Sequence, residues 1–426
     1  MTDLDLPQLA KNAYPGLPNW LSALKLAAKS SFEETGFPAR KDEEWLYTDI
    51  RPITQTDFET ASDFDATEDQ LRSVSLPGVR RVVIVNGKIH AGLSDLDANT
   101  PGLRVSNLET AVKESSFALP LGRYAGFEKF PFVAMNTAQF SDCLVISVAK
   151  NVAIEQPIQA LYVSTSGGDR QTSSQPRTLV VAGENSQLTL IESWITLGDG
   201  IAFTNSVSEF ELSESAFVTH YKINQTGDTS FHISTTQIQQ ASKSVFVSQN
   251  ITLGGGIVRN DVNAVHSGEG VSTTLNGLSL ADGTRIVDNH TSIDHATPNC
   301  ESHELYKYIL DGKGKGVFNG KIFVREDAQK TDAKQTNKTL LLSEDAQIDT
   351  KPQLEIYADD VKCTHGATIG QLDEKQLFYL RSRGISMADA KSLLVYAFAG
   401  EIIHRVKVEA LRNQLDAYLL EKLPQN

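Results

Sequence analysis

A cysteine and a histidine two residues apart are the strongest candidates for chemistry in this sequence. Cys363 and His365 lie in the segment DDVKCTHGAT, residues 359–368. A thiolate and an imidazole both bind zinc and iron, and residues two apart in a strand point to the same side, so one metal could contact both. A closed site needs about four ligands. The pair is therefore either half of a site that a partner completes or a packed thiol beside a hydrogen-bonded histidine.

A second group of potential ligands lies in the region 288–303. Its members are Asp288, His290, Asp294, His295, Cys300, Glu301 and His303. Their spacing matches neither a Cys-x-x-Cys pair nor a helical His-Glu-x-x-His arrangement. Acids and histidines at the turns of a strand repeat are ordinarily surface residues or caps of the turn backbone. The sequence therefore predicts no metal site in this region.

A glycine-rich segment resembles a phosphate-binding loop only in composition. The run GKGKG at 312–316 precedes Gly320-Lys321. In the motif G-x(4)-G-K-[ST], however, Lys315 stands where the leading glycine is required, and Ile322 replaces the hydroxyl that binds the metal ion. The sequence therefore predicts no ATP site in this chain.

Composition and charge exclude several classes of partner. The chain has 426 residues with 39 Lys and Arg against 53 Asp and Glu, a net charge of −14. Such a molecule repels phosphate backbones and anionic lipid headgroups, so neither nucleic acid nor membrane is an expected partner. It begins MTDLD, with no apolar targeting segment, and its three cysteines, Cys143, Cys300 and Cys363, are too few for a disulfide framework. We expect a cytoplasmic location.

The elements that position Cys363 and His365 follow from the hydrophobic periodicity. Helical signals fill the first eighty residues, and a β-branched run, VVIV at 82–85, then meets the hairpin dipeptide Asn86-Gly87. From about residue 140 to residue 362, short alternating strands end in small or polar turns. Helical signals return after Gly370, with Asp373 and Ser386 as predicted N-caps.

This pattern excludes a doubly wound α/β fold and leaves three β architectures: a sandwich, a propeller and a β-helix. A propeller would carry a blade motif, and a sandwich of this length would usually split into several modules. A β-helix grows by stacking coils and is favoured here. The three short C-terminal helices must pack on that solenoid or on another protein, because they cannot bury their apolar faces alone.

The same residues resemble the SufB/SufD family of iron-sulfur cluster assembly scaffolds, in particular its SufD type. The similarity is strongest over 318–398, and it is carried by the following strings: FNGKI (318–322), AKQTN (333–337), LLLS (340–343), PxLEI (352–356), DDVxCxHGATxG (359–370) and FYLxSRG (378–384). A weaker match is EEWxYT at 43–48. The relatively short chain, with three cysteines, resembles SufD more than SufB.

The resemblance implies a mainly β fold, a right-handed parallel β-helix solenoid flanked by N-terminal and C-terminal helical regions. We expect the helical regions at 1–79 and 371–426 and the β-helix core at 80–370. The family implies a non-catalytic scaffold of the SUF system, with a SufB-like subunit and a SufC-like ATPase as partners. The helices after Gly370 would dock the ATPase, and an isolated chain could form a homodimer.

The resemblance also implies a role for the Cys-x-His pair. We expect His365 and Cys363 to lie at the SufB interface and to help hold a nascent iron-sulfur cluster, shared transiently with SufB and not bound stably by this chain alone. ATP binding by SufC would pull on the C-terminal helices and change the exposure of that interface. The sequence leaves open the cluster type, the sulfur route, flavin binding and whether Cys363 is a ligand or a packed thiol.

Two other functions fit a β-helix. Many such proteins are polysaccharide lyases or hydrolases, which would require acids and basic residues along one solenoid face and a secretory signal. A purely structural adaptor is the other alternative, and it predicts that neither Cys363 nor His365 matters for cluster assembly.

Overall fold

Two long, mainly parallel sheets form the body of the molecule. The computed structural model describes residues 17–62, 64, 66–96, 100–114, 119–167 and 171–422. Sheet A contains β1 (Glu59–Thr60), β4 (Leu103–Ser106), β5 (Leu144–Val148), β7 (Thr172–Ser174), β8 (Arg177–Ala182), β10 (Ala202–Leu212), β12 (Phe231–Gln240), β14 (Ile257–His266), β16 (Ile286–His295), β18 (Lys315–Val324) and β20 (Gln347–Ile356). Sheet B contains β2 (Arg80–Val85), β3 (Lys88–Ile89), β6 (Ile158–Thr165), β9 (Gln187–Leu197), β11 (Phe217–Gln225), β13 (Val245–Thr252), β15 (Ser272–Ala281), β17 (Glu301–Leu310), β19 (Asp332–Leu341) and β21 (Lys362–Gly370).

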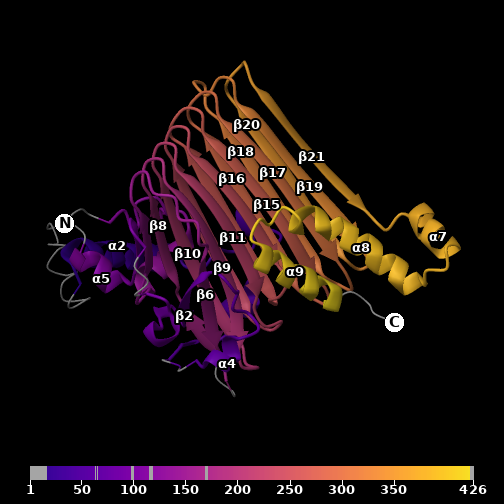
Figure 1. Cartoon of the computed structure of the whole chain (residues 1–426), viewed down its shortest axis with the longest axis horizontal. Coiled ribbons are helices and arrows are strands. Elements are labelled where there is room, and N and C mark those ends of the chain that lie inside the picture. The colour runs from indigo at the N-terminus through magenta and orange to yellow at the C-terminus, as the bar shows by residue number, and fades with distance from the viewer. Residues whose placement is uncertain are drawn as a thin grey trace.

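The order of the strands shows a solenoid. From β8 onward, successive strands alternate between the two sheets, and each pairs in parallel with the strand two positions further along the chain. The chain therefore winds as a coil with one strand per sheet in each turn, and the coils stack along one axis (Figure 1). This arrangement confirms the predicted mainly β fold with a parallel β-helix.

The main core lies between the two sheets. Alternate residues of each strand point inward, as Phe318 and Ile322 do on β18, and they stack on the inward residues of the next coil. The largest apolar cluster draws on both sheets and includes Ile146, Val180, Phe210, Phe246, Leu275, Ile293, Tyr308 and Phe318.

The outer face of sheet A is covered by the N-terminal part of the chain. The elements on this face are α2 (Asn19–Thr35), η1 (Glu43–Trp45), α3 (Arg51–Thr54), α5 (Leu108–Glu114) and α6 (Pro131–Gln139). Two further short helices, α4 (Glu68–Leu71) and η2 (Ala91–Leu93), lie instead on sheet B, where Leu71 and Leu93 pack with Val83 and Leu161. Leu21 of α2 and Leu108 of α5 pack on Val145 and Leu179. Trp45 and Phe132 cover the next strands. Two of these helices, α5 and α6, lie within the range 80–370 that the sequence assigned to the β-helix core.

The outer face of sheet B carries two C-terminal helices. The last elements are α7 (Glu374–Ser382), α8 (Met387–Ile403) and α9 (Glu409–Lys422), and α8 and α9 pack on the outward residues of sheet B (Figure 1). The predicted caps are confirmed: the side chains of Asp373 and Ser386 accept backbone hydrogen bonds from Lys375 and Asp389. By contrast, α7 projects beyond β21. No helix in the described part of the chain has the length and apolar character of a membrane span.

Candidate functional site

The C-terminal end of the solenoid is open. Among the described residues, β20 pairs only with β18 and β21 only with β19, so each sheet ends in a strand with one unpaired edge. These edges are ten and nine residues long. An unpaired edge of this length presents a row of free N–H and C=O groups to any strand that approaches it.

Cys363 and His365 both lie on β21, at this open end. In the strand register Cys363 is beside Ala333 and His365 is beside Gln335. Ala333 and Gln335 are buried, so the two ligand candidates continue inward-facing rows of sheet B. No further coil covers them, and the His365 side chain is exposed. The structure therefore places Cys363 and His365 on the same side of one strand, as predicted. They lie where the core between the two sheets ends.

The surroundings of Cys363 differ from those of His365. The thiol is half-buried and packs against the small apolar cluster of the last coil, which contains Ile322, Val324 and Ala333. Burial raises the pKa of the Cys363 thiol, so the thiol form is favoured in the isolated chain. A metal ion that bound Cys363 would have to displace this proton. The His365 ring, by contrast, is exposed to solvent.

The rim around this pair is apolar. The strand register places Ile348, Leu354 and Ile356 on the inward side of β20, and β21 contributes Ile369. Ile356 is 39% exposed and Ile369 is 51% exposed, although their rows are buried in the preceding coils. Solenoids normally end in a capping repeat with a polar outer face. In the described part of the chain no such repeat follows β21, and this end of the solenoid is left apolar and exposed.

Two polar residues behind His365, Glu304 and Gln335, were not predicted from the sequence as parts of the site. Glu304 on β17 and Gln335 on β19 occupy the same inward row as His365 on β21, and these three strands are neighbours in sheet B. Gln335 Nε2 donates a hydrogen bond to Glu304 Oε2 at 2.6 Å, and both side chains are buried. Burial raises the pKa of Glu304 to about 7. The signal that could have revealed them is the coil length: Glu304, Gln335 and His365 are spaced by about one turn of the solenoid.

The residues between 288 and 303 do not form one site. No group of three potential metal ligands comes together in the part of the chain that the structure describes. The expectation that the acids and histidines are surface groups or turn caps is nevertheless wrong for Asp288 and His295, which are buried; Cys300 is buried as well. His295 lies against His266 inside the solenoid, with their Nδ1 atoms 3.2 Å apart. The alternating pattern of the strand put these residues on different faces.

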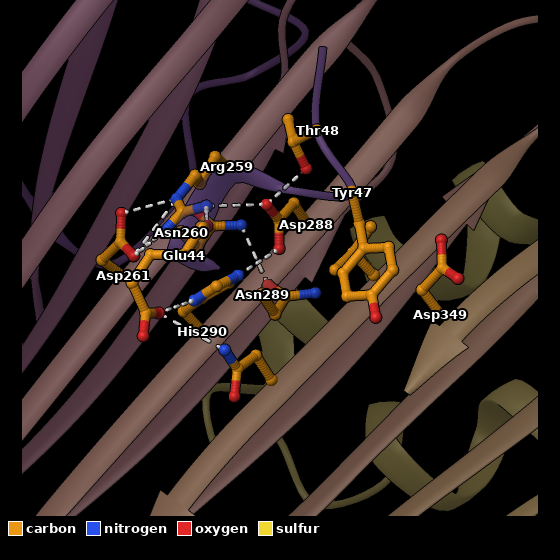
Figure 2. A network of polar contacts seen from close by, with 12 residues as sticks. Glu44, Tyr47, Thr48, Arg259, Asn260, Asp261, Asp288, Asn289, His290 and Asp349 are labelled. Atoms are coloured by element: carbon orange, nitrogen blue, oxygen red, sulfur yellow. Dashed lines mark hydrogen bonds and ion pairs between the residues drawn. The ribbon is translucent and has the colours of Figure 1, made fainter. Parts of the chain in front are cut away.

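Asp288 instead anchors a buried network on the outer face of sheet A (Figure 2). Its Oδ2 accepts hydrogen bonds from Arg259 at 3.0 Å and from Thr48 at 2.6 Å, and its Oδ1 lies 3.0 Å from His290 Nε2. Burial alone would raise the pKa of Asp288, but His290 and Arg259 outweigh it and lower the value to about 2. Burial likewise lowers the pKa of His290, but Asp288 outweighs it and raises the value to about 8.

This network ties the N-terminal segment 43–48 to the solenoid. Glu44 Oε2 lies 3.1 Å from His290 Nδ1, and the Arg259 guanidinium stacks on the Trp45 ring at 3.8 Å from its centroid. Lys315 donates to the backbone carbonyl of Tyr47 at 2.7 Å. These contacts hold the segment EEWxYT, residues 43–48, against strands that lie more than two hundred positions away in the sequence. We call this set of contacts the N-terminal clamp. Arg259, Asp288, His290 and Glu44 are thus paired with one another across this contact.

Comparison with known proteins agrees with the resemblance seen in the sequence. The family model described as "SUF system FeS cluster assembly, SufBD core domain" matches residues 163–398, and "SufBD protein N-terminal region" matches residues 13–160. The iron-sulfur cluster assembly protein SufD of Escherichia coli is 32% identical over 392 residues, which cover 92% of this chain and 90% of that protein.

Two further relatives carry similar descriptions. An iron-sulfur cluster assembly SufBD family protein of Synechocystis is 34% identical over 391 residues, covering 89% of this chain and 86% of the relative. The SufD of Bacillus subtilis is 25% identical over 418 residues, with 95% and 94% covered. The matched models and relatives span both the helical N-terminal part and the solenoid, including its open end. The chain belongs to the SufBD family of iron-sulfur cluster assembly proteins.

Proposed function

We propose that this chain is the SufD-type scaffold subunit of a SufB-SufC-SufD complex, in which it helps assemble iron-sulfur clusters and pass them to recipient proteins. The observation that carries the proposal is the open C-terminal end of the solenoid. There, two long unpaired strand edges and an apolar rim surround an incomplete set of ligands. A homologous β-helical subunit would pair its own terminal strands with β20 and β21 and supply the remaining ligands.

In this complex, His365 and Cys363 contribute to holding the nascent cluster, which is cargo shared with the SufB-like subunit. His365 is the stronger candidate, because its ring is exposed and needs no displacement of packed neighbours. Cys363 would have to lose its proton and leave its partly apolar surroundings. The same open end would also pair with a second copy when the SufB-like subunit is absent.

The C-terminal helices are proposed to dock the SufC-like ATPase. On α7 and at the start of α8, Phe378 is 74% exposed, Tyr379 56% and Leu393 48%, and a shallow groove between the two helices is lined by Tyr379, Leu380 and Leu394. Lys307 of β17 binds Glu401 of α8 at 2.6 Å. A movement of α8 driven by ATP would therefore act on a strand only two places from β21 in sheet B.

The test replaces His365 by alanine in the full complex. We expect His365→Ala to leave the complex intact and to impair cluster assembly strongly, measured as iron and acid-labile sulfide bound per complex. Cys363→Ala distinguishes a ligand from a packed thiol, because a packing role predicts normal assembly. Full assembly by the His365→Ala variant would contradict the proposal, and it would favour the structural adaptor.

A further inference from the structure

One inward row of sheet B is polar in the two coils that precede His365. In register, the row runs through Leu275 on β15, Glu304 on β17, Gln335 on β19 and His365 on β21. Leu275 belongs to the main apolar core, which shows that the row faces inward. Glu304 is 3% exposed and Gln335 1% exposed. A carboxyl and an amide thus lie buried in the two coils directly behind the candidate ligand.

The fold reserves space for the Gln335 amide. On the facing strand β18, a Cβ atom at Gly320 would lie 2.2 Å from Gln335 Nε2. Any other residue at this position would therefore displace the amide. Gly320 belongs to the string FNGKI at 318–322, so the glycine of that string is explained by the side chain opposite it.

Only one of the two polar atoms of the Gln335 side-chain amide has a hydrogen-bond partner among the described residues. Gln335 Nε2 donates a hydrogen bond to Glu304 Oε2. Gln335 Oε1 is buried and has no hydrogen-bond partner among the described residues. A buried acceptor without a partner costs about 1–3 kcal/mol. The next residue of the row is His365, on a neighbouring strand about 4.8 Å away.

We propose that Gln335 is a positioning residue for His365. Its Oε1 accepts the ring N–H of His365 when the partner subunit closes the end of the solenoid, and the other ring nitrogen then faces the cluster. Glu304 holds the amide in the required orientation. Metal-binding histidines commonly donate their second N–H to such an acceptor, which fixes both tautomer and ring orientation. This inference rests on the proposed role of His365 as a ligand.

The test compares three variants in the complex with the SufB-like subunit and the ATPase. Gln335→Met removes the acceptor at similar volume, and Gln335→Glu restores an oxygen at the same position. We expect Gln335→Met to lower the rate of cluster assembly about 10- to 100-fold and to abolish the histidine-nitrogen coupling in the pulsed electron paramagnetic resonance spectrum of the reduced cluster. Gln335→Glu should retain both signals.

The third variant separates positioning from folding. Gln335→Met alone leaves the Glu304 carboxyl without its partner, which could destabilise the core. The double variant Glu304→Met with Gln335→Met removes both polar groups together. A structural role predicts that the double variant recovers assembly, whereas our proposal predicts that it stays impaired and lacks the nitrogen coupling.

The outcomes also distinguish this inference from the proposed function. Wild-type assembly and nitrogen coupling in Gln335→Met, or recovery in the double variant, would overturn the positioning role while His365→Ala remains defective. If His365→Ala itself keeps wild-type assembly and coupling, the ligand role of His365 fails first, and the positioning role fails with it.

Discussion

The two ends of the solenoid are built in opposite ways. At the N-terminal end, sheet A finishes in β4 and sheet B in β3, two antiparallel strands of four and two residues. Short edge strands prevent sheets from pairing with other chains. At the C-terminal end, β20 and β21 are ten and nine residues long and parallel, and their inward residues are partly exposed. One end therefore finishes in short edge strands, and the other leaves two long strand edges and an exposed apolar rim.

Both candidate ligands, Cys363 and His365, lie at the open end of the solenoid, and this position decides whether their ligand set can be completed. Cys143 and Cys300 are fully buried in the body of the molecule, while Cys363 and His365 lie on the last strand. Two ligands in the middle of a closed solenoid could not be completed. At an open end, the missing ligands can come from the protein that covers it.

The largest expected effect comes from blocking the open end. Ile369→Lys would place a charge in the apolar rim, and it should cost about 2–4 kcal/mol of binding free energy, roughly 30- to 1000-fold in affinity for the SufB-like subunit. Phe130→Lys is the matched control, because Phe130 is 50% exposed and belongs to the segment that covers sheet A. Isothermal titration calorimetry with both variants measures the difference. Equal affinities would contradict an interface at the open end.

The buried acid behind the open end should make stability depend on pH. The folded pKa of Glu304 is raised to about 7 from 4.5, so the folded chain keeps a proton that the unfolded chain releases between these values. Stability is therefore lost as pH rises from 4.5 to 7, by about 3 kcal/mol. Glu304→Gln removes this loss. Urea unfolding should show the variant gaining about 3 kcal/mol relative to wild type between pH 4.5 and pH 8, and a constant difference would refute the buried acid.

The N-terminal clamp should also lose stability as pH rises, but over a higher pH range. The folded pKa of His290 is raised to about 8 from 6.5, so its stabilising contribution is complete below pH 6.5 and is lost as pH rises through 8. We expect the stability advantage of wild type over His290→Gln to shrink by about 2 kcal/mol from pH 6 to pH 9. Urea unfolding at each pH measures it, and an advantage independent of pH would exclude a charged His290.

The smallest effect concerns the C-terminal helices. Ser386→Ala removes the N-cap of α8 and should cost about 1 kcal/mol, seen as faster hydrogen exchange in the first turn of that helix. Ser386→Asp keeps a capping oxygen and should exchange like wild type. Equal exchange in both variants would show that packing on sheet B, and not the cap, holds the start of α8.

Local signals in the sequence predicted local structure well. Asn86-Gly87 forms the hairpin between β2 and β3 with positive φ angles of 51° and 84°, and Asp373 and Ser386 cap α7 and α8 as expected. The strand alternation and the C-terminal helical periods are likewise properties of neighbouring residues. Strand alternation alone fits a sandwich, a propeller or a β-helix, because it does not depend on how the strands stack.

The contacts between coils could not be predicted in this way. Gln335 meets Glu304 because strands about thirty positions apart pair in one register, and a slip of one residue would turn both side chains outward. The clamp of Glu44, Arg259 and Asp288 is harder still, because it depends on where the N-terminal segment lies on sheet A. Sequence alone showed the Cys-x-His pair but not that its strand is the last of the sheet.

Hydrogen exchange of the terminal strands tests the central claim most directly. The chain is measured alone in dilute solution and again in the complex with the SufB-like subunit and the ATPase. Our account predicts that amides of β20 and β21 exchange quickly in the free chain and become protected in the complex, while β3 and β4 do not change. Unchanged exchange in β20 and β21 on complex formation would contradict it.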